Sequence, residues 1–202
     1  MHFRPVGADA LLLEVDSASD RTPLDWFAAL DAERAAGRLS VVDIVPGART
    51  VLLDGVADPA GLAARLSDWA FDPASVRPEP PLTVDVRFDG EDLPFVAELA
   101  GLSVAGVVGT LTSTDLTVAF CGFAPGFAYL RGLPWNIPRL PTPRTRVPAG
   151  SVALAAEFAG VYPTASPGGW RIVGRTGAEL FDVARTPPAL MTPGRTVRFR
   201  AA

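Results

Sequence analysis

A stretch rich in proline and glycine, residues 121–153 (CGFAPGFAYLRGLPWNIPRLPTPRTRVPAGSVA), limits most strongly how this chain can fold. It contains six Pro and four Gly. A helix cannot run through it, because each Pro lacks a backbone N–H and biases the preceding residue towards extended angles. Disordered proline-rich segments are polar, whereas this one interleaves bulky apolar residues such as Phe123, Tyr129 and Trp135. We therefore expect a rigid, packed loop system that shapes a binding site.

Composition sets the outer limits. A chain of 202 residues with 49% apolar residues can bury a real core, in one domain or two small ones. No apolar run approaches the ~20 residues of a membrane span. Leu11 to Leu13 lie between Asp9 and Glu14, in a run too short and too charged for a signal peptide. A single cysteine excludes an internal disulfide, so we expect a reducing, cytoplasmic location and no membrane contact.

Two residue types are nearly absent. The chain contains no Lys, so all 18 basic residues are Arg. A phosphate loop with its Lys, a Lys Schiff base and a kinase-type Lys are thereby excluded. The one His is His2, which removes a Ser-His or Cys-His nucleophile pair and any His-based metal cluster within this chain. The remaining chemistry must use Arg, carboxylates, hydroxyls and backbone groups, or be shared with a partner.

Charge is unevenly distributed along the chain. Residues 116–178 carry +5, with Glu157 as their one acid, whereas the whole chain carries −4. A solvated basic face is one interpretation. The other is ligand binding, because Arg held among Pro, Gly and aromatic residues can grip a carboxylate or phosphate with its planar fork. The patch is small and the chain acidic overall, so we do not expect a nucleic-acid partner.

The first 80 residues have the pattern of a small α/β sandwich domain. Thr22-Pro23 and Asp58-Pro59 are helix starts, with the polar side chain as N-cap and Pro in the first turn. Strands are expected on both sides of Gly7 and on both sides of Pro46-Gly47. The order of strands and helices suggests the split βαβ kind of α+β domain. Residues 72–82, with four Pro, indicate a linker.

Residues 81–202 indicate a second, mainly-β domain. Alternation predicts a half-buried strand over 83–88, and two short helices are expected over 91–100 and 103–111. Further short strands are expected at 117–120, 151–156, 170–174 and 196–200. Turn signals at Ser166-Pro167-Gly168-Gly169 and Thr192-Pro193-Gly194 separate the last of them. Many short strands with few helices favour a closed barrel.

Four long motifs resemble one family. GFAPGFAYL (122–130), LPTPRTRVPAGSV (140–152), GVYPTASPGGWRIVGRT (160–176) and the tail FD…PPALMTPGRTVRF (181–199) are similar to the B subunit of bacterial ATP-dependent 5-oxoprolinase. This family is also known as allophanate hydrolase subunit 1 and includes a sporulation kinase inhibitor. The resemblance covers roughly the last 120 residues closely, and the strand-turn-strand VVDIVPGARTVLL (41–53) more loosely.

The resemblance implies a cyclophilin-like barrel behind an α+β N-terminal domain. It also implies a hetero-oligomer with a C subunit and a separate A subunit, which opens 5-oxo-L-proline to L-glutamate with ATP and Mg²⁺. The sequence contains no recognisable binding site for ATP or for Mg²⁺. Where family members often carry His, Tyr and Gln, this sequence has Thr112, Leu116 and Phe158.

Eight residues are candidates for ligand contact: Arg144, Arg146, Ser166, Gly168, Gly169, Phe123, Pro125 and Tyr129. An arginine of the TPRTRVPAG segment suits a carboxylate or phosphate, and the alternative is a surface charge or an ion pair with Glu157. The SPGGW turn can point amide donors at an oxyanion, or it is a tight turn between barrel strands. The aromatic residues, with Phe127, line a pocket for a flat lactam ring or belong to the core.

Two further residues look structural rather than catalytic. Cys121 follows an apolar strand and has no His to activate it, so we expect it to be buried and inert. Glu157 is surrounded by Arg, which favours an ion pair over a general base. No catalytic residue and no metal ligand can be assigned from the sequence.

Two functions from different classes fit this sequence. The leading interpretation is a non-autonomous enzyme subunit that shares its site with a partner chain. The second is a regulatory protein that inhibits a sensor histidine kinase, as the resemblance also allows. Prolyl isomerase activity would follow from the fold name alone, and fold does not fix function.

Overall fold

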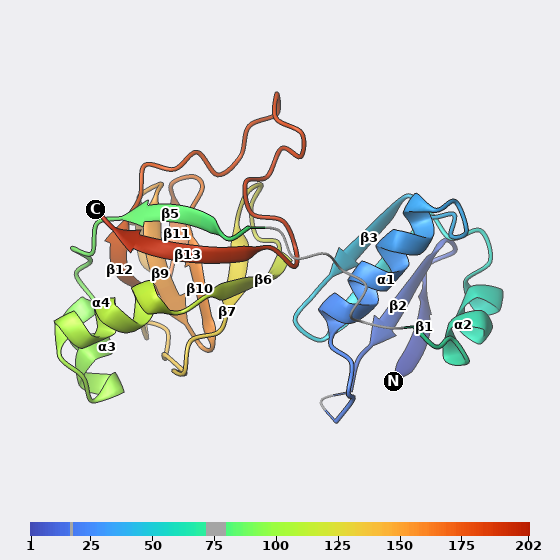
Figure 1. Ribbon diagram of the computed structural model, residues 1–202, viewed down its shortest axis with the longest axis horizontal. Helices are drawn as coiled ribbons and strands as arrows, with labels where there is room; N and C mark the ends of the chain where they lie inside the picture. Colours follow the sequence, from blue (N-terminus) through green and yellow to red (C-terminus); the bar gives the residue numbers. More distant parts are fainter. Residues whose placement is uncertain (17, 72–79) are drawn as a thin grey trace. The chain divides into compact units, whose positions relative to one another are not determined.

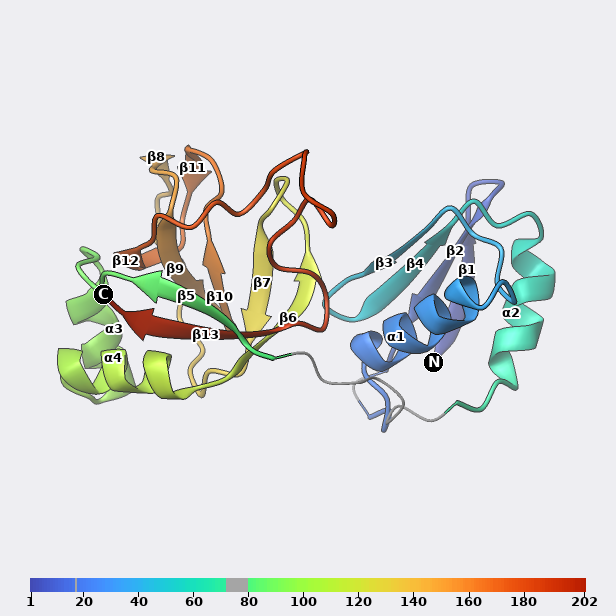
Figure 2. The same cartoon turned by 45° about the horizontal axis from the view of Figure 1, so that its top comes forward.

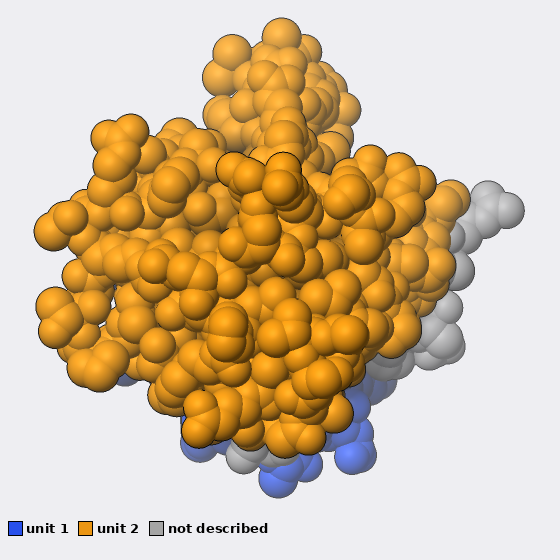
Figure 3. All heavy atoms as spheres, turned by 90° about the vertical axis from the view of Figure 1, so that its left-hand side faces the viewer, with its two compact units in different colours: residues 1–78 blue, residues 79–202 orange. Residues whose placement is uncertain are grey.

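The computed structural model describes residues 1–16, 18–71 and 80–202. The chain divides into two compact units, Met1–Pro78 and Glu79–Ala202, coloured separately in Figure 3. Each unit is described by itself. The linker expected over residues 72–82 lies mostly outside the described residues.

The first unit is a four-stranded sheet with two helices (Figure 1). Its sheet has the order β1-β2-β4-β3, with every neighbouring pair antiparallel. Because β4 lies between β2 and β3 and is antiparallel to both, β2 and β3 run parallel, and α1 connects them. The expected split βαβ arrangement is therefore confirmed. The elements are β1 (His2–Val6), β2 (Ala10–Glu14), α1 (Pro23–Ala35), β3 (Asp43–Pro46), β4 (Thr50–Asp54) and α2 (Pro59–Ser67).

Local signals fix the helix starts of this unit. The Thr22 Oγ1 atom accepts a hydrogen bond from the Asp25 N–H, and the Asp25 carboxylate accepts one from the Thr22 N–H at 2.7 Å, which is a capping box. At α2 the Asp58 carboxylate accepts from the Gly61 N–H at 2.9 Å. Trp69 lies just beyond the end of α2. It still packs against the core that surrounds Trp26.

The second unit is built on one seven-stranded sheet of order β12-β9-β10-β7-β6-β13-β5 (Figure 1). The one parallel pair is β13 with β5. A bridge between Arg87 and Arg175, with both N–H···O distances at 2.9 Å, joins the two end strands and closes the sheet into a barrel. The elements are β5 (Leu82–Val86), α3 (Leu93–Ala100), α4 (Val104–Ser113), β6 (Leu116–Cys121), β7 (Ala128–Arg131), β8 (Arg144–Val147), β9 (Ser151–Ala155), β10 (Phe158–Val161), β11 (Ser166–Gly168), β12 (Arg171–Arg175) and β13 (Thr196–Ala201).

The barrel interior and the two helices share one core. Inward side chains such as Val118, Leu130 and Leu154 are fully buried there, together with Leu111 of α4. β13, at the end of the chain, lies between β6 and β5 and contributes buried Val197 to the same core. The fold class expected from the sequence, an α+β unit followed by a mainly-β barrel, is confirmed.

The helices of the described residues can be compared with the length of a membrane span. No single helix there is long and apolar enough to cross a bilayer. Leu93–Ala100 and Val104–Ser113 reach the required length and hydropathy together, but they meet at 87°.

Part of the sequence interpretation needs correction. Ser166 to Gly168 form strand β11 instead of the expected turn, and β11 pairs with β8 in a small second sheet (Figure 2). Gly168 explains the difference, because a Cβ atom at this position would overlap the hydroxyl of Tyr162. The segment can thus lie flat against its neighbours as a strand. The sequence pattern also does not predict β7, β8 and β10.

Candidate functional site

The outer side of the barrel sheet carries a second cluster of buried side chains, distinct from the barrel interior. Strand alternation creates it, because Leu130 points into the barrel while its neighbour Tyr129 points outward. We call this surface the aromatic face, and its rings come from β6, β7, β10 and the loops beside them: Phe120, Phe123, Phe127, Tyr129, Phe158, Tyr162 and Trp170.

Phe127 is the centre of the aromatic face. Its ring meets Phe123, Tyr129, Tyr162 and Trp170 edge to face, with centroid distances of 5.0–5.5 Å. Gly160 leaves the space for this arrangement: a Cβ atom there would lie 2.9 Å from Phe127 Cζ and 3.1 Å from Trp170 Cζ3. For Phe127 the core interpretation is therefore the right one.

The GFAPGF turn forms the exposed edge of this face. Phe123 is 63% exposed, although it is large and apolar, and it has a left-handed backbone with φ of 70°. A non-glycine residue in this region carries strain of order 1 kcal/mol, and such strain clusters at functional sites. Pro125 is exposed beside it, and Tyr129 is half-buried and stacks on Phe120 at 4.1 Å. The structure thus brings together the three aromatic-loop candidates, Phe123, Pro125 and Tyr129, on one turn and the strand after it.

An ion-pair cluster borders the aromatic face at Trp170. Arg144, at the start of β8, contacts Asp92 through Nη2 at 2.9 Å and Glu91 through Nε at 2.9 Å. Its Nη1 donates to the Trp170 carbonyl at 3.3 Å. Asp92 is 7% exposed and also accepts a hydrogen bond from the Ile172 N–H at 2.7 Å. The guanidinium fork of Arg144 is therefore held by the chain's own carboxylates.

Arg171 completes this cluster. Its Nη1 lies 3.5 Å from Asp92, its Nε donates to the Pro138 carbonyl at 3.2 Å, and its guanidinium stacks over Phe95 at 3.7 Å. Sequence reasoning missed Asp92 and Glu91, because they precede α3 and lie about fifty residues before Arg144. The Asp92-Leu93-Pro94 helix start was the available signal.

Arg146 differs from Arg144. Its side chain is exposed, and it has no ion-pair partner among the residues that the structure describes. The two arginine candidates thus lie in unlike surroundings: Arg144 is paired with carboxylates, and Arg146 is available to an anion.

The β11 candidates lie against Tyr162 and the proline-rich loop. The Ser166 Oγ atom is buried and has no hydrogen-bond partner within the described part of the chain. Gly168 contacts the Tyr162 hydroxyl, and Gly169 is buried near Leu140 and Pro143. Burial raises the pKa of Tyr162, and the hydrogen bond with the Trp170 backbone opposes this effect.

Glu157 forms an ion pair as expected, whereas Cys121 is half-buried and not fully buried as expected. Glu157 pairs with Arg131 at 2.7 Å, and Arg131 also lies over the Phe158 ring. Burial raises the pKa of the Cys121 thiol to about 11, and its Sγ lies 3.4 Å from the Met191 carbonyl oxygen. A thiol with such a pKa is protonated at neutral pH and is a weak nucleophile.

The three positions that depart from the family pattern have ordinary structural partners. The Thr112 hydroxyl donates to the Val108 carbonyl within α4 at 2.9 Å. Leu116 is buried in the barrel core, and Phe158 belongs to the aromatic face.

The carboxylates among residues 1–16, 18–71 and 80–202 do not fit a Mg²⁺ centre. Among the described residues, no three His, Cys, Asp or Glu side chains come together in a way that could hold a metal ion. Asp92 and Glu91, the two acids nearest the aromatic face, are engaged by Arg144. The donor set for a metal-assisted step is therefore missing from the part of the chain that the structure describes.

The chain thus consists of a small α+β unit followed by a barrel unit that carries the aromatic face. A sequence model of the family described as carboxyltransferase domain, subdomain C and D, matches residues 1–191, and the chain belongs to this family.

Its curated relatives include the B subunit of 5-oxoprolinase from Escherichia coli O157:H7, which is 39% identical over 178 residues. That alignment covers 83% of this chain and 81% of the relative. The 5-oxoprolinase B subunit of Haemophilus influenzae is 36% identical, with 83% of each chain covered. The resemblance found in the sequence motifs is confirmed.

Solved structures share the fold. TTHA0988 matches 96% of this chain with a TM-score of 0.78 and 33% identity, and this chain spans 40% of that protein. The uncharacterized protein PH0987 from Pyrococcus horikoshii matches the whole chain at a TM-score of 0.58 and 30% identity, with 97% of its own length covered. The Kluyveromyces lactis urea carboxylase has a TM-score of 0.75 at 18% identity, and this chain spans 21% of it. The last match concerns the fold alone.

Proposed function

We propose that this chain acts as the B subunit of an ATP-dependent 5-oxoprolinase, which opens 5-oxo-L-proline to L-glutamate together with a C subunit and an A subunit. One observation carries the proposal. Two relatives that bear the name of the 5-oxoprolinase B subunit align with more than four-fifths of this chain and of their own lengths.

The chain's own residues support a shared site. ATP hydrolysis normally needs a phosphate cradle and a Mg²⁺ site. This chain has no Lys and one His, and its described residues hold no metal-ligand cluster. ATP with Mg²⁺ therefore acts at the level of the complex. The longer chains of TTHA0988 and urea carboxylase are compatible with this view, because there the same fold is joined to further polypeptide.

The substrate contacts of this chain would lie along the edge of the aromatic face. The exposed guanidinium of Arg146 suits the carboxylate of 5-oxoproline, and Phe123, Pro125 and Tyr129 offer apolar surface to the lactam ring. Ser166, Gly168 and Gly169 would support the site through the position of β11 against Tyr162, because the Ser166 hydroxyl is buried. Arg144 is a positioning residue, because its contacts with Asp92 and the Trp170 carbonyl hold the aromatic face in place.

The test is reconstitution. The chain alone should show no 5-oxoproline-dependent ATP hydrolysis, whereas co-expression with homologues of the C and A subunits should yield a stable complex that does. We expect an interface of roughly 2,000 Å² or more, as in obligate assemblies. Turnover by the purified single chain, or separate elution of the partners at micromolar concentration, would refute the proposal.

Variants of the reconstituted complex test whether Arg146 contacts the substrate. Arg146→Lys keeps the charge but loses the bidentate fork, so activity should fall by about ten- to a hundredfold while the melting temperature stays the same. Arg49→Lys, an exposed arginine of the first unit, is the matched control and should leave activity unchanged. Unchanged activity in Arg146→Lys would remove Arg146 from the site.

A further inference from the structure

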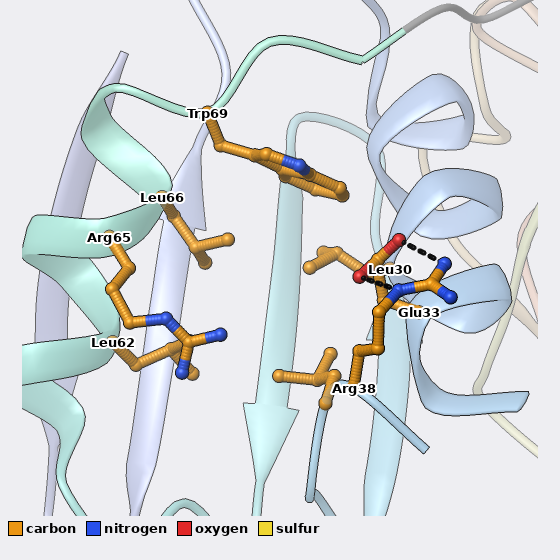
Figure 4. Close-up of a pocket in the computed structure, with 8 residues that line it drawn as sticks. Leu30, Glu33, Arg38, Leu62, Arg65, Leu66 and Trp69 are labelled. Carbon is orange, nitrogen blue, oxygen red and sulfur yellow. Dashed lines mark hydrogen bonds and ion pairs between the residues drawn. The ribbon is translucent and has the colours of Figure 1, made fainter. Parts of the chain in front are cut away.

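The first unit contains a hollow of about 70 Å³ between α1 and α2 (Figure 4). One buried water needs about 10–15 Å³, so the hollow has room for about five waters or a similar number of ligand heavy atoms. Its floor is apolar and belongs to the core of the unit: Leu30, Leu39, Leu62 and Leu66 are all buried. Water makes few favourable interactions with such a floor, whereas burial of a short hydrocarbon group there is favourable in free energy.

Three charged side chains surround this floor. Glu33 on α1 accepts two hydrogen bonds from Arg38, from Nε at 2.9 Å and from Nη2 at 2.7 Å. The hydrogen bonds from Arg38 lower the pKa of Glu33, so this pair stays ionised and neutral overall. Arg65 extends from α2 on the opposite side of the hollow (Figure 4). It has no ion-pair or hydrogen-bond partner among the described residues, so the hollow carries one unbalanced positive charge.

An aromatic ring covers one side. The half-buried indole of Trp69 extends over the hollow from the end of α2 towards α1 (Figure 4). Its position is fixed by an edge-on contact with Trp26 at 5.7 Å and by Phe71 at 4.8 Å. The ring offers a rigid apolar surface without the need to order a mobile side chain.

We propose that this hollow is a binding site for a small monocarboxylate with a short apolar body. The carboxylate would pair with Arg65, and the hydrocarbon part would lie on the leucine floor beneath Trp69. A dicarboxylate is disfavoured, because its second charge would meet Glu33. An organic cation is disfavoured by the two arginines. The site lies within the first unit and does not rest on the function proposed above.

The experiment is an NMR titration of the full chain with butyrate, which has six heavy atoms, and with the neutral isostere butyramide. The reporter is the indole N–H signal of Trp69, assigned through its loss in Trp69→Phe. We expect butyrate to shift this signal saturably with a Kd of about 1–10 mM, and butyramide to bind at least tenfold more weakly. Equal shifts with butyrate and butyramide, or a linear response without saturation up to about 100 mM, would overturn the proposal.

Two arginine variants identify the anion contact. Arg65→Gln should weaken butyrate binding at least tenfold without changing the melting temperature, because Arg65 is exposed and supports no ion pair among the described residues. Arg49→Gln removes an exposed arginine elsewhere on the same unit and should leave the Kd unchanged. An equal loss of affinity in both variants would indicate a general charge effect and would contradict a built site. Binding unchanged in Arg65→Gln would also overturn it.

Discussion

At the scale of single residues, Asp92 has the largest structural role near the candidate site. It lies just before α3, and its carboxylate accepts hydrogen bonds from the Ile172 N–H of β12 and from Arg144 of β8. One buried carboxylate thus ties a helix to two strands that belong to different sheets. Asp92 also holds Arg144 in an ion pair, whereas the exposed Arg146 is the arginine proposed above to contact the ligand.

We expect Asp92→Asn to destabilise the protein. The substitution keeps the shape but removes the charge that Arg144 and Arg171 face in a buried position, at a cost of about 2–3 kcal/mol, or about 5–10 °C in melting temperature. Glu91→Gln is the matched control, because Glu91 contacts the same Arg144 but is exposed, and its loss should cost less than about 0.5 kcal/mol. Thermal melts of both variants decide this. A similar loss of stability in both variants would show that burial does not increase the contribution of Asp92 to stability.

The raised pKa of Cys121 predicts how the reactivity of its thiol depends on pH. Because the pKa of its thiol is about 11, the thiolate is a minor species at pH 8, and its amount grows about tenfold per pH unit until pH approaches 11. A free cysteine has a pKa near 8.5 and is partly ionised at pH 8. Even though a more basic thiolate is a better nucleophile, we expect alkylation of native Cys121 by iodoacetamide at pH 8 to be at least about tenfold slower than that of glutathione. A rate that levels off near pH 8.5 would contradict the raised pKa.

At the scale of elements, the sequence predicts those parts whose signals are local. The helix beginning at Thr22-Pro23 and the one capped by Ser103 carry their start signals within four residues, and both form as expected. β7 and β10 escape prediction because each is only four residues long, although each pairs with the strand just before it in the chain, β6 and β9 respectively. The turn expected at Ser166 is a strand because it pairs with Val147 of β8, a contact that the local turn signal does not show.

The same limit applies to the candidate site. The aromatic residues and arginines are visible as a cluster in the sequence, because the proline-rich stretch holds most of them together. The sequence does not show which arginine is paired with carboxylates, because the carboxylates that bind Arg144 come from the start of α3, outside the basic segment. Nor does the sequence separate Phe127, which is buried, from Phe123, which is exposed four residues earlier.

The packing of β10 against the aromatic face can be tested with glycine substitutions. Gly160→Ala would place a methyl group against Phe127 and Trp170, and we expect a loss of about 1–3 kcal/mol from overpacking. Gly109→Ala, on the exposed side of α4, meets no atom within 4 Å and should stabilise the protein by about 0.5–1 kcal/mol through helix propensity. Chemical denaturation of the two variants provides the measurement. If Gly160→Ala left the free energy of unfolding unchanged, the rings of Phe127 and Trp170 would have to be able to move apart.

At the scale of the whole molecule, each compact unit has its own core. The core around Trp26 and Leu30 involves residues of the first unit alone, whereas the barrel core and the aromatic cluster involve residues of the second. Each unit thus has the apolar content that independent folding requires. The proposed anion site of the first unit and the candidate site of the second are accordingly open to separate experiments.

We therefore expect the fragment of residues 79–202 to fold alone and to melt in one cooperative transition. A fragment of residues 79–194 is the control. It lacks β13, which is hydrogen-bonded to both β5 and β6 and buries Val197 and Phe199 in the barrel. Without it, two strands lose their shared neighbour and the sheet cannot close, so this fragment should show no cooperative melt. Circular dichroism and calorimetry of both fragments make the comparison. If residues 79–202 melt without cooperativity, the second unit depends on the first for its fold, and variants of its candidate site must be studied in the full chain.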